Sequence, residues 1–318
     1  MINFKFIVAS TDDQDLRLDK FIKKYFSDIP YSIIQKKIRL GKFKVNSKKK
    51  SPSYKVIYLD KIYYVDNIVL VENKKNKSYV SEKIKTLIKK SIIYEDNYIL
   101  ILNKPYGIPV QGGSKVNLSI DDILPFLVSK KITPRLTHRI DKNTTGILII
   151  AKSKEAAKSI TKLFKEDKIE KIYWTITIGI PKNKEGVIKA PISKTRINGI
   201  EKMKVDETLE KEAITYYKIL DTSKDLSLIE VTPKTGRTHQ IRVHLLSKGI
   251  SVLGDNKYRL QKIKQDKFER HDYRMHLHAK NIKFKLNNKI YSINAALPQH
   301  FQKTLRENKL KFIKKNDN

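Results

Sequence analysis

Three polar segments of the 318-residue chain carry side chains that could do chemistry. The first is His138-Arg-Ile-Asp-Lys-Asn-Thr-Thr-Gly146, in which Asp141 offers a carboxylate. An ionised carboxylate can act as a nucleophile or as a general base. An aspartate in a polar turn before a strand is more often a plain turn residue, so the spacing alone leaves both interpretations of Asp141 open.

The second segment is an alternating stretch at residues 171–180, in which Tyr173 offers a phenol. Apolar and polar residues alternate with a period of two, which predicts a strand with one apolar and one polar face. Tyr173 falls on the polar face with Thr175 and Thr177. A tyrosine in this setting usually packs or covers a surface, so the strand by itself assigns it no role.

The third segment is Pro233-Lys-Thr-Gly-Arg-Thr-His-Gln-Ile-Arg242. It is expected to run from a strand end through a glycine turn into a helix at 238–246 that Thr238 caps. The amides at such a helix start can bind an anion. His239 and Arg242 are three residues apart and therefore share a face. The alternative is an ordinary phosphate-binding loop without catalysis.

The charge balance predicts a polyanionic partner. The chain has 67 Lys and Arg against 33 Asp and Glu, a formal net charge of +34, and nucleic acid is the usual partner of such an excess. The absence of cysteine excludes disulfides, thiolate nucleophiles and cysteine-ligated zinc. Neither a signal peptide nor an apolar run of membrane-spanning length is recognisable, so we expect a cytoplasmic protein.

Two further patterns suggest other chemistry. His276 and His278 would face the same way in a strand and could hold a metal, but no third ligand is apparent, which favours structural histidines. A serine hydrolase would need a G-x-S-x-G turn, which the sequence lacks.

The N-terminal part predicts a compact basic unit. Apolar spacing indicates a helix at 18–26. A second helix should follow, with Ser32 as its cap, Gln35 in capping-box position and Gly41 as its stop. A half-buried strand is expected at 43–45, and residues 73–78 are typical of a linker. The basic residues of this unit are Lys36, Lys37, Arg39, Lys42, Lys44 and Lys48 to Lys50; a solvated surface and an RNA-binding surface fit them equally.

The remainder predicts a strand-rich domain with helices. A hairpin is expected from strands at 92–94 and 98–102, and a buried strand at 147–151. A helix at 154–165 should be capped by Ser153. A further strand is expected at 226–232.

These elements and motifs resemble the RluA/RluC/RluD family of pseudouridine synthases. HRIDKNTTGILIIAKS, starting at His138, is similar to the family signature, whose usual form begins HRLD. The segment from Asn103 to Val110 and PKTGRTHQIRVHLLSKGISVLGDNKY resemble the upstream and downstream motifs. Leu16 to Asn46 is similar to an S4 RNA-binding domain. Order and spacing match over nearly the whole chain; Asn143 and Thr145 stand where acidic and serine residues are common.

The resemblance implies an α+β fold with an S4-like RNA-binding domain at residues 14–77. A pseudouridine synthase catalytic domain would follow at 78–318, with a mixed, largely antiparallel sheet crossed by the active cleft. The implied activity is isomerisation of uridine to pseudouridine in structured RNA, with 23S ribosomal RNA of the large subunit as the expected substrate. The reaction needs no cofactor or metal. We expect a monomer that does not bind membranes.

The resemblance also assigns residue roles. Asp141 corresponds to the essential aspartate, Arg242 to the arginine that pairs with it, and Tyr173 to the active-site tyrosine. The target base must be flipped out of its stack, and Arg139 corresponds to the arginine that fills the vacated space or holds the base. His138 would support the turn. The expected substrate and RNA contacts are Arg237, His239, Asn103, Lys104, Gln111, Lys36, Lys37 and Arg39.

The main alternative is an RNA-binding ribosome-assembly factor that does not catalyse. The charge and the S4-like segment fit it as well, but a pure binder has no need to keep Asp141, Tyr173 and Arg242 together.

Overall fold

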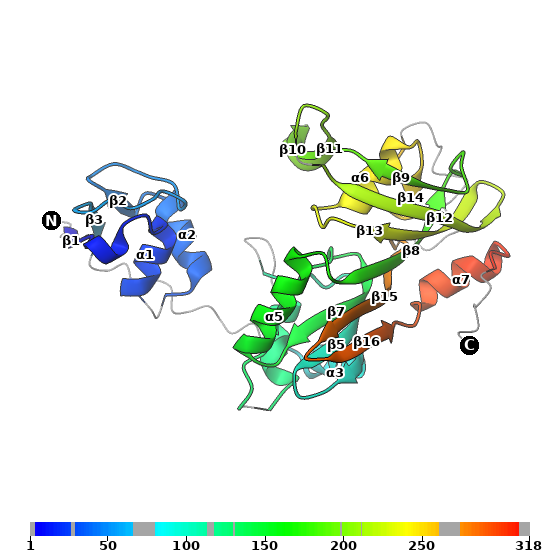
Figure 1. Ribbon diagram of the computed structural model, residues 1–318, viewed down its shortest axis with the longest axis horizontal. Coiled ribbons are helices and arrows are strands. Elements are labelled where there is room, and N and C mark those ends of the chain that lie inside the picture. The colour runs from blue at the N-terminus through cyan, green and yellow to red at the C-terminus, as the bar shows by residue number, and fades with distance from the viewer. Residues whose placement is uncertain are drawn as a thin grey trace. The chain divides into compact units, whose positions relative to one another are not determined.

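The chain forms two compact units, Met1–Tyr79 and Val80–Asn318. The computed structural model describes residues 4–26, 29–65, 80–112, 118–129, 131–197, 199–210, 212–260 and 274–311. Figure 1 shows the elements of each unit, which are treated separately below. The expected domain boundary at residues 77 and 78 and the expected linker at 73–78 lie outside the described residues.

The N-terminal unit is a three-stranded antiparallel sheet with two short helices. The strand order is β1 (Phe4–Val8), β3 (Lys61–Val65), β2 (Phe43–Val45). Helices α1 (Leu18–Tyr25) and α2 (Tyr31–Arg39) pack together, and a 3-10 turn at Thr11–Asp13 precedes them. The core is built from fully buried apolar side chains, among them Leu18, Phe21, Ile22, Ile34, Ile38 and Phe43.

Helix α2 corrects the expected cap. Pro30 occupies the N-cap position, so Ser32 is already inside the helix, and the prediction of a Ser32 capping box is wrong. Proline starts the helix because its ring fixes φ and no amide hydrogen is left without a partner. Gln35 instead donates from Nε2 to Asp19 Oδ2 at 3.1 Å, tying α2 to α1. The expected stop is confirmed, since the helix ends before Gly41, whose φ is +72°.

The second unit is organised around an eleven-stranded sheet, which confirms the predicted mixed, largely antiparallel architecture. Among the described pairings only β7 and β15 run parallel. The main path is β4 (Ile92–Glu95), β5 (Ile99–Lys104), β7 (Thr145–Ala151), β15 (Leu277–Leu286), β8 (Glu170–Ile178), β13 (Leu226–Pro233), β12 (Ile214–Ser223) and β9 (Glu185–Lys189).

Three short or peripheral strands extend this sheet, and one hairpin stands apart. β6 (Arg135–Leu136) pairs with β7, β14 (Ser251–Val252) with β8, and β16 (Lys289–Asn294) with β15. The separate hairpin consists of β10 (Ile192–Ile197) and β11 (Ile200–Val205).

Helices cover both faces of the sheet. Side chains at alternate positions of β5 divide between two cores: Ile99 and Ile101 pack with α5 (Lys154–Lys165), and Leu100 and Leu102 pack with α3 (Glu82–Lys90) and α4 (Ile120–Ile123). A 3-10 turn at Leu124–Phe126 follows α4. Farther along the sheet, α6 (Gln240–Ser247) packs with Ile229 and Val231 of β13, and α7 (Gln299–Glu307) with Leu228. No described helix is long and apolar enough to cross a membrane.

Strand β8 differs from the expectation of a polar face. Thr175 and Thr177 are fully buried, because β8 lies in the interior of the sheet between β15 and β13. Thr175 satisfies its hydroxyl by donating to the backbone oxygen of His276 at 2.8 Å. The alternation along β8 therefore separates two covered faces, and Tyr173 lies on the face that packs against α5 and α6.

The two histidines at the start of β15 are structural. Both are fully buried. His278 Nδ1 lies 2.8 Å from Thr145 Oγ1, and His276 Nε2 lies 2.9 Å from Thr304 Oγ1. Within the part of the chain that the structure describes, no group of three potential metal ligands occurs.

Candidate active site

Two hydrogen bonds hold the loop that carries Asp141. The ring nitrogen Nε2 of His138 accepts from the backbone amide of Ile149 at 2.8 Å, and the backbone amide of Thr144 donates to the backbone oxygen of Asp141 at 3.1 Å. Burial, with a contribution from Lys171, lowers the pKa of His138 to about 3. His138 is therefore neutral near pH 7 and supports the turn, as expected.

Gly146 lets the strand after this loop approach its neighbour. Its φ is +102°, in the region that side chains disfavour, and a Cβ there would clash with the backbone of Ala279 on β15. The glycine thus permits the parallel contact between β7 and β15 that places the Asp141 loop over the sheet.

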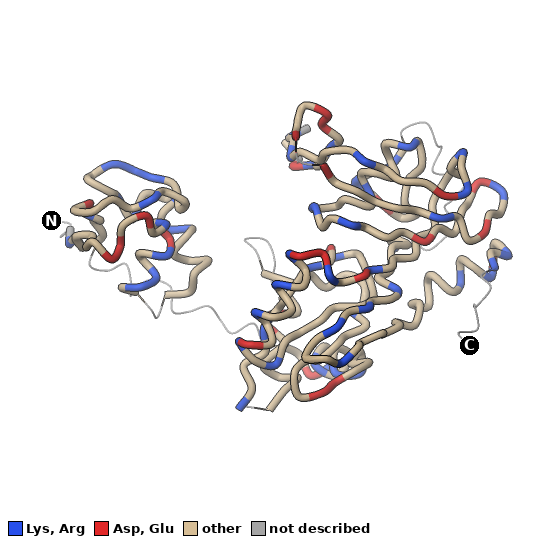
Figure 2. Tube along the Cα trace, viewed as in Figure 1, with Lys and Arg blue, Asp and Glu red and all other residues tan. Residues whose placement is uncertain are grey.

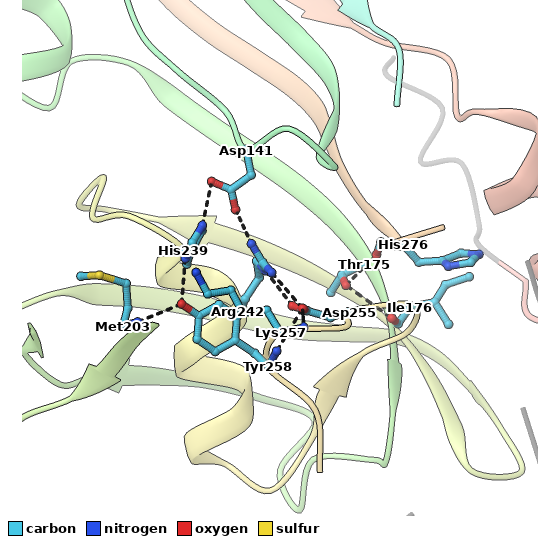
Figure 3. Close-up of polar contacts among 10 residues, drawn as sticks. All are labelled: Asp141, Thr175, Ile176, Met203, His239, Arg242, Asp255, Lys257, Tyr258 and His276. Atoms are coloured by element: carbon cyan, nitrogen blue, oxygen red, sulfur yellow. Dashed lines mark hydrogen bonds and ion pairs between the residues drawn. The ribbon is translucent and has the colours of Figure 1, made fainter. Parts of the chain in front are cut away.

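Arg242 of α6 joins two carboxylates. Its Nη1 donates to Asp141 Oδ2 at 2.9 Å. Its Nε and Nη2 donate to the two oxygens of Asp255, at 2.6 and 2.8 Å (Figure 3). The Arg242 side chain is 8% exposed, that of Asp141 27% and that of Asp255 0%. Burial alone would lower the pKa of Arg242, but its bonds to Asp255 and Asp141 raise it above the ordinary value, so the cation is permanent.

His239 lies on the other side of Asp141. Its Nε2 is 3.8 Å from Asp141 Oδ1, and its Nδ1 is 2.7 Å from the hydroxyl of Tyr258 (Figure 3). That hydroxyl accepts from the amide of Met203 at 2.9 Å. If it donates its own proton to Nδ1, the imidazole hydrogen remains on Nε2, facing Asp141. Burial lowers the pKa of His239 more than Asp141 raises it, which favours this neutral form.

The start of α6 corrects the predicted cap. The helix begins at Gln240, its N-cap is His239 with φ +56°, and Thr238 does not cap it. The side chain of Gln240 instead folds back onto the preceding loop: its Oε1 accepts from the amide of Arg237 at 3.0 Å and from Thr235 Oγ1 at 2.8 Å. The left-handed turn at His239 brings its ring and Arg242 to the same carboxylate.

A small pocket opens beside Asp141 and encloses about 110 Å³. A cavity of about 150 Å³ is known to hold a benzene ring, so this open pocket matches a single ring in scale. Its wall includes Tyr173, and burial together with the charge of Asp141 raises the pKa of this phenol, which stays protonated. The predicted residues that line it are Arg139, Asp141, Tyr173, Arg237, His239 and Arg242.

Three other predicted residues lie outside the lining of this pocket. Lys104 is fully buried and donates to the backbone oxygens of Pro105, Ile108 and Lys142, each at 3.0 Å. It therefore shapes the Asp141 loop and has no surface with which to touch RNA; burial lowers its pKa to about 7, against the charge of Asp141. Asn103 donates to the oxygen of Ala296 at 2.9 Å, and Gln111 is exposed.

The basic residues predicted to bind RNA in the N-terminal unit lie on α2. Lys36 and Arg39 are exposed, and Lys37 is half-buried. Lysine and arginine positions are frequent on the tubes of both units in Figure 2.

Asp255 and Tyr258 were missed as functional residues. Both stand in the GDNKY end of the downstream motif, but nothing in their spacing indicates that they reach Arg242 and His239. Asp255 also stabilises the turn that carries both residues, because its Oδ1 accepts from the backbone amides of Lys257 and Tyr258 at 2.9 and 3.0 Å. The Arg242 guanidinium lies 4.8 Å from the centre of the Tyr258 ring. An aspartate that caps its own turn was the available signal.

Comparisons with known proteins show the family to which the chain belongs. Residues 98–247 match the model of a family described as RNA pseudouridylate synthase. The chain is 36% identical over 294 residues to a ribosomal large subunit pseudouridine synthase C of Rickettsia bellii, covering 90% of this chain and 96% of the relative. A protein of the same name from Vibrio parahaemolyticus is 33% identical over 305 residues, 95% of each chain. The solved human RNA pseudouridylate synthase domain containing 4 is 28% identical with a TM-score of 0.61, covering 74% of this chain and 98% of that one.

Proposed function

The chain belongs to the RNA pseudouridylate synthase family, and on that premise we propose that it isomerises uridines of large-subunit ribosomal RNA with Asp141 as the reacting carboxylate. The activity follows from the family. The substrate is proposed because relatives that align over nearly their whole length are named ribosomal large subunit enzymes.

The observation that carries the residue assignment is the Arg242–Asp141 contact of 2.9 Å at the wall of a ring-sized pocket. The permanently charged guanidinium donates to Asp141 Oδ2 and fixes the direction in which the carboxylate faces the pocket. Asp141 Oδ1 lies 3.8 Å from His239 Nε2, beyond hydrogen-bond distance, so Oδ1 is better placed to react than Oδ2, which Arg242 binds.

The reaction breaks the bond between N1 and C1′ of uridine and forms one between C5 and C1′. The hydrogen on C5 is lost, and N1 gains one, so atoms and electrons balance without a redox partner. Asp141 can start this reaction in one of three ways: by attack at C1′, by attack on the base or by deprotonating the sugar. Tyr173 supplies a protonated phenol at the pocket wall, suited to stacking and donation; a base role would first require it to lose its proton against a raised pKa.

Binding would be shared between the units. The target uridine has to leave its stack to reach the pocket, and Arg139, exposed at the pocket wall, is placed to hold the flipped nucleotide or fill its space. We assign RNA docking to Lys36, Lys37 and Arg39 of the N-terminal unit, consistent with an S4-like domain. Replacing these three with glutamine should weaken affinity for ribosomal RNA fragments in a salt-dependent way; unchanged affinity would exclude this assignment.

The decisive experiment replaces Asp141 with asparagine. Pseudouridine should no longer form in large-subunit ribosomal RNA incubated with Asp141→Asn, as mapped chemically along the RNA. RNA affinity should stay within about threefold of the original, because a carboxylate contributes little attraction to a polyanion. Pseudouridine formation by the variant would contradict the assignment of Asp141, and failure of the unaltered protein on this RNA would contradict the proposed substrate.

A further inference from the structure

A second concavity lies next to the catalytic pocket, where β8 begins and β13 ends, alongside β15. It encloses about 480 Å³. We name it the lysine groove after its five lysines: Lys168, Lys171, Lys234, Lys283 and Lys285. Its remaining wall includes the apolar residues Ile169, Pro233, Phe284 and Ile290.

The groove and the catalytic pocket adjoin. Pro233 lines both. Lys171 precedes Tyr173 by two residues on β8, so their side chains leave the same face of the strand. Pro233 follows Val231 by two residues on β13, and Val231 is the partner of Tyr173 in the sheet. A ligand that extends out of the pocket past Tyr173 therefore meets Lys171 and Pro233 next. Lys283 and Lys285 leave the opposite face of the sheet, and the ligand reaches them around the start of β8, where one lining includes all four residues.

The charge of the groove is unbalanced. Its five lysines face two lining carboxylates, Asp167 and Glu170. Lys171 and Lys234 share Asp167, at 3.8 and 2.8 Å. Among the described residues, neither Lys283 nor Lys285 forms an ion pair, although both are exposed.

The partly buried position of Lys171 favours the binding of an anion beside it. Its side chain is only 15% exposed, and burial, with the nearby Lys234, lowers its pKa in spite of Asp167. Like charges gathered in a partly desolvated place are costly until an anion enters. A phosphate at this point would interact favourably with both lysines.

The wall of the groove also suits a base. Ile290 is 65% exposed, an unusual position for a large apolar side chain, and it lies among the lysines of the groove lining. An exposed apolar side chain beside lysines suits a nucleotide, whose base needs an apolar contact and whose phosphate needs cations.

We propose that the lysine groove is a subsite for a nucleotide of the substrate RNA that flanks the target uridine. This rests on the proposed function, and it deepens it by assigning a second nucleotide-binding position outside the catalytic pocket. The groove would hold the strand while the neighbouring base is extruded, so its contribution belongs to RNA binding and leaves the chemical step unchanged.

The test uses the full chain with Lys283→Gln/Lys285→Gln. Among the described residues, neither lysine forms an ion pair with a carboxylate, so the substitutions leave no carboxylate without its partner. The matched control is Lys182→Gln/Lys224→Gln, which removes two charges from exposed positions outside both linings. For each protein, the KM and kcat for pseudouridine formation in a large-subunit ribosomal RNA fragment are measured, together with the salt dependence of RNA binding.

The groove variant should raise KM about three- to tenfold with kcat unchanged. The slope of log affinity against log salt should fall by about 0.7 for each phosphate that the protein no longer neutralises, hence by about 1.4 relative to the unaltered protein. A groove variant that matches the control in KM and slope overturns the subsite. If the unaltered protein forms no pseudouridine, the proposed function fails instead, so the two failures are distinguishable.

Discussion

Asp255 accepts hydrogen bonds from Nε and Nη2 of Arg242, and Asp141 accepts one from Nη1. The bidentate geometry that guanidinium and carboxylate prefer is thus formed with the buried, non-reacting aspartate. The carboxylate in the pocket receives a single bond from Arg242, on Oδ2, and its Oδ1 faces His239 across 3.8 Å. Asp255 therefore determines how Arg242 meets Asp141, the carboxylate that we propose to react.

Replacing Asp255 with asparagine should lower kcat about 100-fold while RNA affinity changes little. An amide cannot accept both guanidinium bonds, so Arg242 is free to turn and engage both oxygens of Asp141, and small misplacements at a reacting centre are costly. The variant Asp96→Asn is a suitable control. Asp96 is also largely buried and accepts from Tyr94 and Tyr291, but it lies outside the pocket lining. A kcat for Asp255→Asn equal to that of the control would contradict the positioning role.

The stability of the second unit should depend on pH through three histidines. Burial lowers the pKa of His138, His276 and His278 from 6.5 to about 3 each. Between pH 3 and 6.5 the unfolded chain then binds more protons than the folded one. The free energy of unfolding therefore rises with pH in this window, and the stability that these histidines contribute is lost as the pH falls. Each histidine contributes at most about 1.4 kcal/mol per pH unit.

Urea unfolding between pH 4 and 7 measures the slope of the free energy of unfolding against pH. The variant His138→Gln should show a slope smaller by about one proton, because a glutamine oxygen can still accept from the amide of Ile149 but does not titrate. The same slope in both proteins would mean that His138 is protonated in the folded state.

Gly146 should tolerate no side chain. Alanine at this position combines a disfavoured φ of +102° with a clash against Ala279, and should lower the free energy of unfolding by at least about 3 kcal/mol. Gly107→Ala is the matched control, since its φ of +83° is also positive but no atom lies within 4 Å of the added carbon. It should cost about 1–2 kcal/mol. Equal losses in thermal or urea unfolding would show that the contact with β15 is not tight.

Local signals were enough to predict several elements from the sequence. Helix α5 begins and ends where apolar spacing and the Ser153 cap indicate, and Ser153 Oγ does accept from the amide of Ala156 at 3.1 Å. The β4–β5 hairpin follows from two short apolar runs around a polar turn. In each case, the residues that determine the element lie within it, so the chain elsewhere has little influence.

The errors arose where another residue occupied the expected position, or where a role depended on contacts with a distant part of the chain. Ser32 and Thr238 are good caps by type, but Pro30 and His239 occupy the N-cap positions of those helices instead. The role of Asp255 depends on contacts made only after the sheet has formed. The meeting of Asp141 with Arg242, 101 residues away, was expected from resemblance and not from any local pattern.

The order of strands in the sheet has a consequence for synthesis. β7, which follows the Asp141 loop, and β8, which carries Tyr173, are not neighbours; β15, made more than a hundred residues after both began, lies between them. When the chain has been synthesised through Leu277, all the residues that line the pocket have been made. The rest of β15, the strand that pairs with both β7 and β8, has not. Catalytic competence is therefore acquired late during translation, after the whole of β15 has emerged.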